Sequence, residues 1–168
     1  DCNVAVDDEG QPLAGAEQRL QAILPTIQHL QTLGARVILL THLGRPGGHP
    51  VESLRLDDVA RQLGVLLETP VRYVPDIRGP RARALVDQLQ DGDIALLENL
   101  RFEPGEEKAD PAFADALASL GDVVVQDAFS VSHRSHASVA VLPRLRPSYA
   151  GLLVEREVDV LQRILVNP

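Results

Sequence analysis

Short apolar runs alternate with longer amphipathic runs along most of the chain. The short runs, such as Val123, Val124 and Val125, have the length and the branched side chains of buried strands. Between them, apolar residues recur at the spacing that forms one face of a helix. Strands alternating with helices indicate βαβ units, in which a mostly parallel sheet is covered by helices on both faces. We therefore expect a three-layer α/β fold, doubly wound and Rossmann-like.

Turn residues separate these runs and give approximate boundaries. Residues 1–6 have the alternation of a strand end, and Pro25 lies inside a helical pattern, where a kink is expected. The expected strands are 36–40, 71–74, 94–97 and 123–125, and the expected helices are 16–33, 56–67, 81–89, 111–120 and 150–166.

Length and charge limit the class of protein. A chain of 168 residues suits one domain with a sizeable core, and no apolar run approaches the roughly 20 residues of a membrane span. The chain opens on Asp1 and Cys2 without the pattern of a signal peptide, and one cysteine excludes an internal disulfide. A net charge of -8 argues against nucleic-acid or membrane partners, which require a basic face.

Polar side chains follow the expected strands, at the edge where open α/β sheets bind ligands. Each of three strands is followed by a loop that contains an arginine. Several positive groups meeting in an acidic chain would form an anion site. For any single arginine, pairing with one of the 24 acidic residues at the surface remains the alternative. The basic candidates are Arg19, His42, Arg45, Arg101 and Arg134, with His133 and His136 as further members.

Other candidates are weaker. Asp1 and Asn3 suit contacts with a substrate hydroxyl or carboxylate, and a turn or cap role is the alternative. The two histidines at 133 and 136 lack cysteine or acidic companions, so we expect no metal site. Residues 106–108, with sequence EEK, are interpreted as an exposed helix entrance.

Nucleotide-binding motifs are absent from the sequence. We find neither a GxxxxGK[ST] phosphate loop nor a GxGxxG fingerprint. A dinucleotide-binding protein of the same fold class is therefore a poor alternative.

Several motifs, in the order in which they occur, resemble the amino-terminal domain of bacterial phosphoglycerate kinase. DCNV at 1–4 resembles the family's DFNV, EQRL at 17–20 its arginine segment, and THLGRP at 41–46 its SHLGRP. The stretch 96–138, which contains ENLRF and DAFSVSHRSH, runs almost in register with the family pattern, and 147–158 approximates LPSYAGLLVEREV. The likeness spans nearly the whole chain, and the motifs are specific when found together.

The resemblance implies a glycolytic phosphotransferase with a carboxyl group as acceptor. It would move a phosphoryl group reversibly between 1,3-bisphosphoglycerate and ADP, giving 3-phosphoglycerate and ATP. Residues 1–149 would form the acid-substrate domain, and 150–168 a helix leading to an absent domain that binds ATP or ADP with Mg²⁺. The family implies a cytoplasmic monomer without nucleic-acid or membrane partners, and an isolated fragment that is inactive.

Site residues follow from the resemblance position by position. Arg45, Arg101 and Arg134 would clamp the phosphate of 3-phosphoglycerate, and Arg19 would be catalytic by stabilising the transferring phosphoryl group. The complete expected substrate set is Asp1, Asn3, Arg19, His42, Leu43, Gly44, Arg45, Arg101 and Arg134.

The chain departs from the family pattern at a few positions. Ala5 replaces a proline, Gln126 an asparagine and Ser130 a glycine, and the first strand is largely missing. A serine in place of a glycine would distort the loop if that position needs a positive φ or a close approach of backbone. These departures motivate an alternative function, a non-catalytic anion-binding or interaction module that retains the fold.

Overall fold

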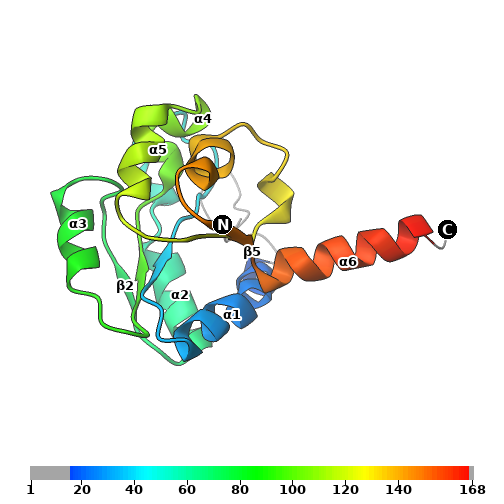
Figure 1. Ribbon diagram of the computed structural model, residues 1–168. Coiled ribbons are helices and arrows are strands. Elements are labelled where there is room, and N and C mark those ends of the chain that lie inside the picture. Colours follow the sequence, from blue (N-terminus) through cyan, green and yellow to red (C-terminus); the bar gives the residue numbers. More distant parts are fainter. Residues whose placement is uncertain (1–15, 167–168) are drawn as a thin grey trace.

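The computed structural model describes residues 16–166, whose strands form two parallel sheets (Figure 1). The first sheet has the order β1–β3–β2, so β3 is its central strand, and the second pairs β4 with β5. Helices flank both sheets, and the expected α/β fold with parallel strands is confirmed. The strands are β1 (Val37–Leu39), β2 (Val71–Tyr73), β3 (Ile94–Leu96), β4 (Val124–Gln126) and β5 (Ser148–Ala150).

The helices agree with the expected amphipathic runs to within a few residues. Pro25 lies inside the first helix, which nevertheless continues over 17 residues. The α-helices are α1 (Ala16–Thr32), α2 (Asp57–Leu67), α3 (Pro80–Asp87), α4 (Pro104–Glu107), α5 (Pro111–Ala118) and α6 (Leu152–Val166). Short 3-10 turns are η1 (Glu52–Leu54), η2 (Leu100–Phe102), η3 (Phe129–Val131) and η5 (Leu142–Arg144), and η4 (Ala137–Val141) is a π-helical turn.

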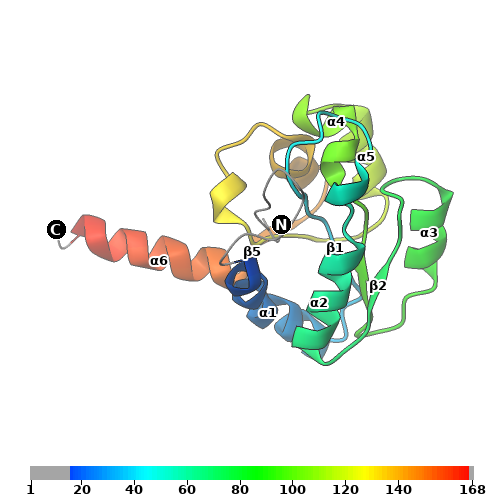
Figure 2. The same ribbon diagram turned by 180° about the vertical axis from the view of Figure 1, so that it is seen from behind.

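The central strand β3 is buried on both faces, which explains its uninterrupted apolar sequence. Ile94 and Leu96 pack with α1 and α2 in one core cluster. Leu97, just beyond the strand, packs with Ala82 of α3 on the opposite face. A further cluster joins Phe113 of α5 to η2 and η4. Helices thus cover both sides of the first sheet, as Figure 2 also shows.

Two elements were not expected from the sequence. The three residues of β5 are exposed, so they show no apolar run that would indicate a strand. The helix α4 has only four residues, which is too short for a helical period to appear. The expected strand end at 1–6 lies outside the described residues.

The last helix, α6, extends away from the rest of the structure (Figure 1). Asp127 Oδ1 accepts hydrogen bonds from the backbone N–H groups of Leu153 and Val154, at 3.0 and 3.2 Å. Thr26 Oγ1 accepts one from Leu152 N at 3.0 Å, so the start of α6 is tied to both α1 and the end of β4. In 16–166, no helix combines the length and hydropathy of a membrane-spanning segment.

Candidate anion site

Basic side chains from three loops lie close together beyond the carboxyl ends of β1, β3 and β4. His42 follows β1, Arg101 lies in η2 after β3, and Arg134 follows η3 after β4. Electrostatic interactions connect Arg101 with Arg134 and each of them with His42. Arg45 also acts electrostatically on Arg101, although its own side chain is exposed. The topology therefore gathers like charges from distant parts of the sequence.

Arg101 is buried, with 6% of its surface exposed. Burial first, and the neighbouring Arg134 second, lower the pKa of Arg101, but a guanidinium remains charged because its ordinary pKa is so high. Its Nη1 donates to the carbonyl of Gly44 at 2.8 Å, and its Nε lies 3.8 Å from the carboxylate of Glu107. Within 16–166, the buried Nε atoms of Arg101 and Arg134 have no hydrogen-bond acceptor. Two such donors on mutually repelling cations suit a small anion.

His42 carries a neutral imidazole at neutral pH. Burial, reinforced by the charge of Arg101, lowers the pKa of His42 to about 3. A neutral imidazole has one nitrogen that donates and one that accepts. His42 is thus suited to a hydrogen bond with a ligand oxygen rather than to an ion pair.

The fully buried side chain of Asn99 holds the loop after β1 in place. Its Nδ2 donates to the carbonyls of Leu43 at 2.8 Å and Leu54 at 2.9 Å, and its Oδ1 accepts from Arg101 N at 3.1 Å. Gly44 has a φ of +62°, and a Cβ there would lie 2.8 Å from Leu54 Cδ2. The positive φ favours glycine at this position, and the hydrogen bond from Asn99 to Leu43 holds the loop backbone.

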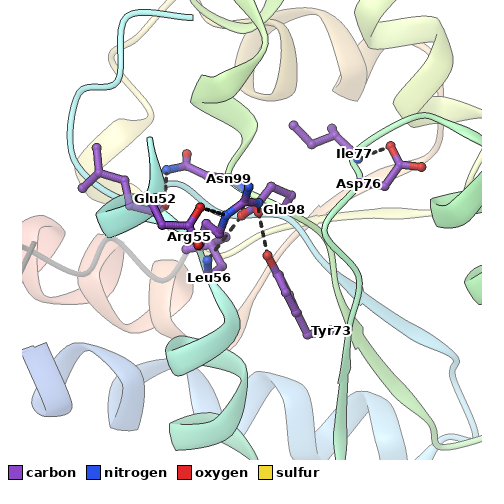
Figure 3. A network of polar contacts seen from close by, with 9 residues as sticks. Glu52, Arg55, Leu56, Tyr73, Asp76, Ile77, Glu98 and Asn99 are labelled. Atoms are coloured by element: carbon purple, nitrogen blue, oxygen red, sulfur yellow. Dashed lines mark hydrogen bonds and ion pairs between the residues drawn. The ribbon is translucent and has the colours of Figure 1, made fainter. Parts of the chain in front are cut away.

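A second polar network lies next to Asn99 and is centred on Glu98, which is 4% exposed (Figure 3). Its carboxylate accepts from Tyr73 Oη at 2.6 Å and Arg55 Nη1 at 2.9 Å. The backbone N–H groups of Leu56 and Asn99 donate at 3.3 and 2.8 Å. This network joins β2, the end of β3 and the start of α2, and it includes Asn99, which holds the loop after β1.

The interpretation of residues 106–108 as an exposed helix entrance was wrong for Glu106, which is 3% exposed. Its Oε1 accepts from Ser138 Oγ at 2.6 Å, and its Oε2 accepts from Ser138 N at 3.1 Å. His136 Nδ1 lies 3.7 Å from Oε1. Burial raises the pKa of Glu106, against the effect of the Ser138 hydrogen bonds. Glu107 and Lys108 are exposed, as expected.

The other predicted candidates are Arg19, His133, Asp1 and Asn3. Arg19 lies on the first turn of α1 and is exposed, and its catalytic role stays a prediction. Asp1 and Asn3 lie outside the described residues. His133 is exposed, and no group of three histidine, cysteine or acidic side chains within 16–166 is arranged to hold a metal ion.

A cavity of about 550 Å³ lies between β1 and β4. Apolar side chains of both strands line it together with polar groups. The polar lining includes His42, Glu106, His136 and Ser138. His42 and His136 thus lie both next to the charged arginines and at this cavity.

Two departures from the family pattern are accommodated in the structure. Gln126 Nε2 donates to the carbonyl of Ala128 at 3.3 Å. Ser130 is exposed in η3, and its φ is not positive. A positive φ is therefore no source of distortion at this position.

Sequence reasoning missed Asn99 and Glu106 as parts of the site. Asn99 carried a usable signal, because a polar residue directly after a buried strand lies at the ligand-binding edge. Glu106 carried none, because only the packing of α4 against η4 shows that its carboxylate turns inward.

Comparisons with known proteins cover the whole chain. The sequence model of the phosphoglycerate kinase family matches residues 1–168. Phosphoglycerate kinase of Caulobacter sp. strain K31 is 51% identical over 152 residues, or 90% of this chain and 38% of that protein. The enzyme of Caulobacter vibrioides is 49% identical over 168 residues, or 100% of this chain and 42% of that protein.

Solved structures agree with the sequence matches. Phosphoglycerate kinase from Pyrococcus horikoshii OT3 superposes with a TM-score of 0.84 at 35% identity, covering 95% of this chain and 40% of that one. The phosphoglycerate kinase from Coxiella burnetii gives 0.83 at 34% identity, covering 100% and 41%. The chain spans about two fifths of the length of these relatives. It belongs to the phosphoglycerate kinase family, of which it represents the amino-terminal region.

Proposed function

We propose that this chain is the acid-substrate part of a phosphoglycerate kinase. The observation that carries the proposal is the pair of buried guanidinium Nε atoms, on Arg101 and Arg134, at the same edge of the fold. A phosphate group offers several oxygens to such donors and neutralises their repulsion. The ligand of this site is 3-phosphoglycerate or, in the reverse direction, 1,3-bisphosphoglycerate.

Each side chain of the site has a proposed task. Arg45, Arg101 and Arg134 hold the phosphate, and the neutral imidazole of His42 hydrogen-bonds to a ligand oxygen. Leu43 and Gly44 contribute backbone groups of the loop that Asn99 fixes. Asp1 and Asn3 contact the hydroxyl or carboxylate end of the acid.

The reaction is phosphoryl transfer between the acid's carboxyl group and ADP or ATP. Such transfer depends on positioning and on neutralising charge, for which Arg19 is the proposed catalytic residue. The nucleotide and its Mg²⁺ bind the part of the protein that follows residue 168. Residues 1–149 form the substrate domain, and the projecting helix α6 lies in the connecting segment 150–168. The family implies a cytoplasmic monomer.

Calorimetric titration of 3-phosphoglycerate into the chain tests the proposal. Arg134→Ala removes one charged donor, which contributes roughly 1.5–3 kcal/mol, so affinity should fall at least about tenfold. Arg61→Ala is the matched control, because that exposed arginine pairs with Asp58 on the surface of α2. Equal affinity in both variants would reject the site. Neither variant nor the unaltered chain should transfer phosphate from MgATP without the rest of the protein.

The alternative function is a non-catalytic anion-binding module, and one of the observations that motivated it is weakened. Its motivation was partly the replacement at Ser130, which the loop accommodates without a positive φ. Tight binding of inorganic phosphate with no preference for 3-phosphoglycerate would favour this alternative.

A further inference from the structure

Glu106 is a buried carboxylate that joins two parts of the anion site. It comes from α4, which begins three residues after Arg101. Both of its oxygens accept hydrogen bonds from Ser138, which lies four residues after Arg134. Glu106 therefore connects the segment that carries one guanidinium to the segment that carries the other.

Such a connection is needed because the two guanidinium groups repel each other. Without a tether, the segment 128–138 would relax so that the two charges move apart. Hydrogen bonds to the backbone N–H and to the hydroxyl of Ser138, at 3.1 and 2.6 Å, oppose this movement. The groups that face the carboxylate include His42 and Arg101, which act on it electrostatically, and His136, whose Nδ1 lies 3.7 Å from Oε1.

We propose that Glu106 is a positioning residue of the anion site, which holds Arg134 close to Arg101 through its two hydrogen bonds to Ser138. The identity of the ligand rests on the proposed function, but the tether itself does not. Hydrogen bonding, rather than the negative charge, is the essential part. A neutral amide can also pair with Ser138, because its oxygen accepts from the N–H and its NH₂ group donates to the hydroxyl.

Three variants and one control separate a tether from a general structural role. Glu106→Ala removes both hydrogen bonds, and Glu106→Gln keeps them without the charge. Asp58→Ala is the control, because it removes an exposed carboxylate that pairs with Arg61 on the surface of α2. Ser138→Ala removes the hydroxyl and keeps the backbone N–H, and it serves as a milder variant if the Glu106→Ala chain fails to fold.

The first measurement is amide hydrogen exchange of residues 132–140 without ligand. Exchange should be at least about tenfold faster in Glu106→Ala and unchanged in Glu106→Gln and Asp58→Ala. The second measurement is the affinity for 3-phosphoglycerate. It should fall at least about tenfold in Glu106→Ala, fall about threefold in Ser138→Ala, and recover fully in Glu106→Gln.

The outcomes separate the two proposals. Unchanged exchange in Glu106→Ala overturns the positioning role. The role is also overturned if exchange and affinity in Glu106→Gln change as much as they do in Glu106→Ala. If the unaltered chain fails to bind 3-phosphoglycerate while Glu106→Ala still accelerates exchange, the proposed function fails and the tether stands.

Discussion

Two groups of polar side chains lie beyond the strands of this molecule, and they differ in how completely they are paired. Around Glu98 and Asn99, the carboxylate and the amide meet donors or acceptors at 2.6 to 3.3 Å. Around Arg101 and Arg134, like charges lie near each other, and a buried Nε on each has no acceptor within the described part of the chain. The polar groups around Glu98 and Asn99 are paired within the protein, whereas those around Arg101 and Arg134 keep donors that a ligand can pair with.

The pairing of a buried polar group indicates whether it stabilises the fold or is available to bind a ligand. A buried polar group that is fully paired contributes rigidity, whereas an unpaired one is costly until something binds to it. In this fold the two groups are in contact, because Asn99 of the paired group donates a hydrogen bond to Leu43 in the loop that contributes to the unpaired group. The scaffold and the site should therefore respond to substitution in opposite ways.

The largest effect is expected from Asn99→Ala. The carbonyls of Leu43 and Leu54 and the N–H of Arg101 would lose their partner, at a cost of about 3 kcal/mol or more in the free energy of unfolding. Urea denaturation measures this loss. Gln88→Ala, which removes an exposed amide bonded to Arg72, is the control. Similar stability in both variants would mean that Asn99 is not part of a scaffold.

The opposite response is expected from Arg101→Met. Affinity for 3-phosphoglycerate should fall about 30-fold, because one charged clamp is lost. The free energy of unfolding should change by less than about 1 kcal/mol, since a buried charge is replaced by an apolar chain. The carbonyl of Gly44, which would lose its donor, is only partly buried. A large loss of stability would place Arg101 with the scaffold instead.

A pH-dependent difference is expected from His42→Asn. Because the pKa of His42 is lowered to about 3, the folded protein disfavours the imidazolium, and the unfolded chain takes up the proton first. The stability present above pH 6.5 is lost as the pH falls towards 3, by at most about 1.4 kcal/mol per pH unit. The variant should lack this slope in thermal melts. His29→Asn, at an exposed position on α1, should retain it.

The smallest effect is expected from Tyr73→Phe, which removes the 2.6 Å hydrogen bond to Glu98. The cost should be about 1 kcal/mol at neutral pH. Burial, together with that hydrogen bond, raises the pKa of Tyr73, so the fold favours the protonated phenol. The unaltered chain should therefore lose stability as the pH rises above 10, and the variant should lose less. Tyr149→Phe, at an exposed position, should change neither value.

The repeating elements were predictable from the sequence because burial imposes a period on them. The apolar runs at 37–40 and 94–97 indicated β1 and β3, and the leucine spacing of 56–67 indicated α2. In β5 the residues are exposed, so no period marks the strand. The inward turn of Glu106 depends on contacts with Ser138, 32 residues further along the chain, which local patterns do not encode.

The arginines of the site were predictable in part. Their positions after buried strands suggested a common edge, and the structure brings Arg101 and Arg134 together there. Which arginines pair with acids instead could not be foreseen. Arg55, Arg61 and Arg78 form ion pairs with carboxylates, as the surface alternative describes. The sequence does not distinguish the two groups, because the choice depends on which carboxylates the fold brings within reach.

The attachment of α6 has a mechanical consequence. Asp127 holds the start of this helix, and a Cβ on Gly151 would collide with the Asp127 carboxylate, so the junction is tightly packed. With 15 residues at a rise of about 1.5 Å each, α6 is a lever roughly 22 Å long. A tilt of about 10° at Gly151 would move its far end by roughly 4 Å. A small movement at the packed junction around Asp127 would thus become a larger displacement at the far end of α6.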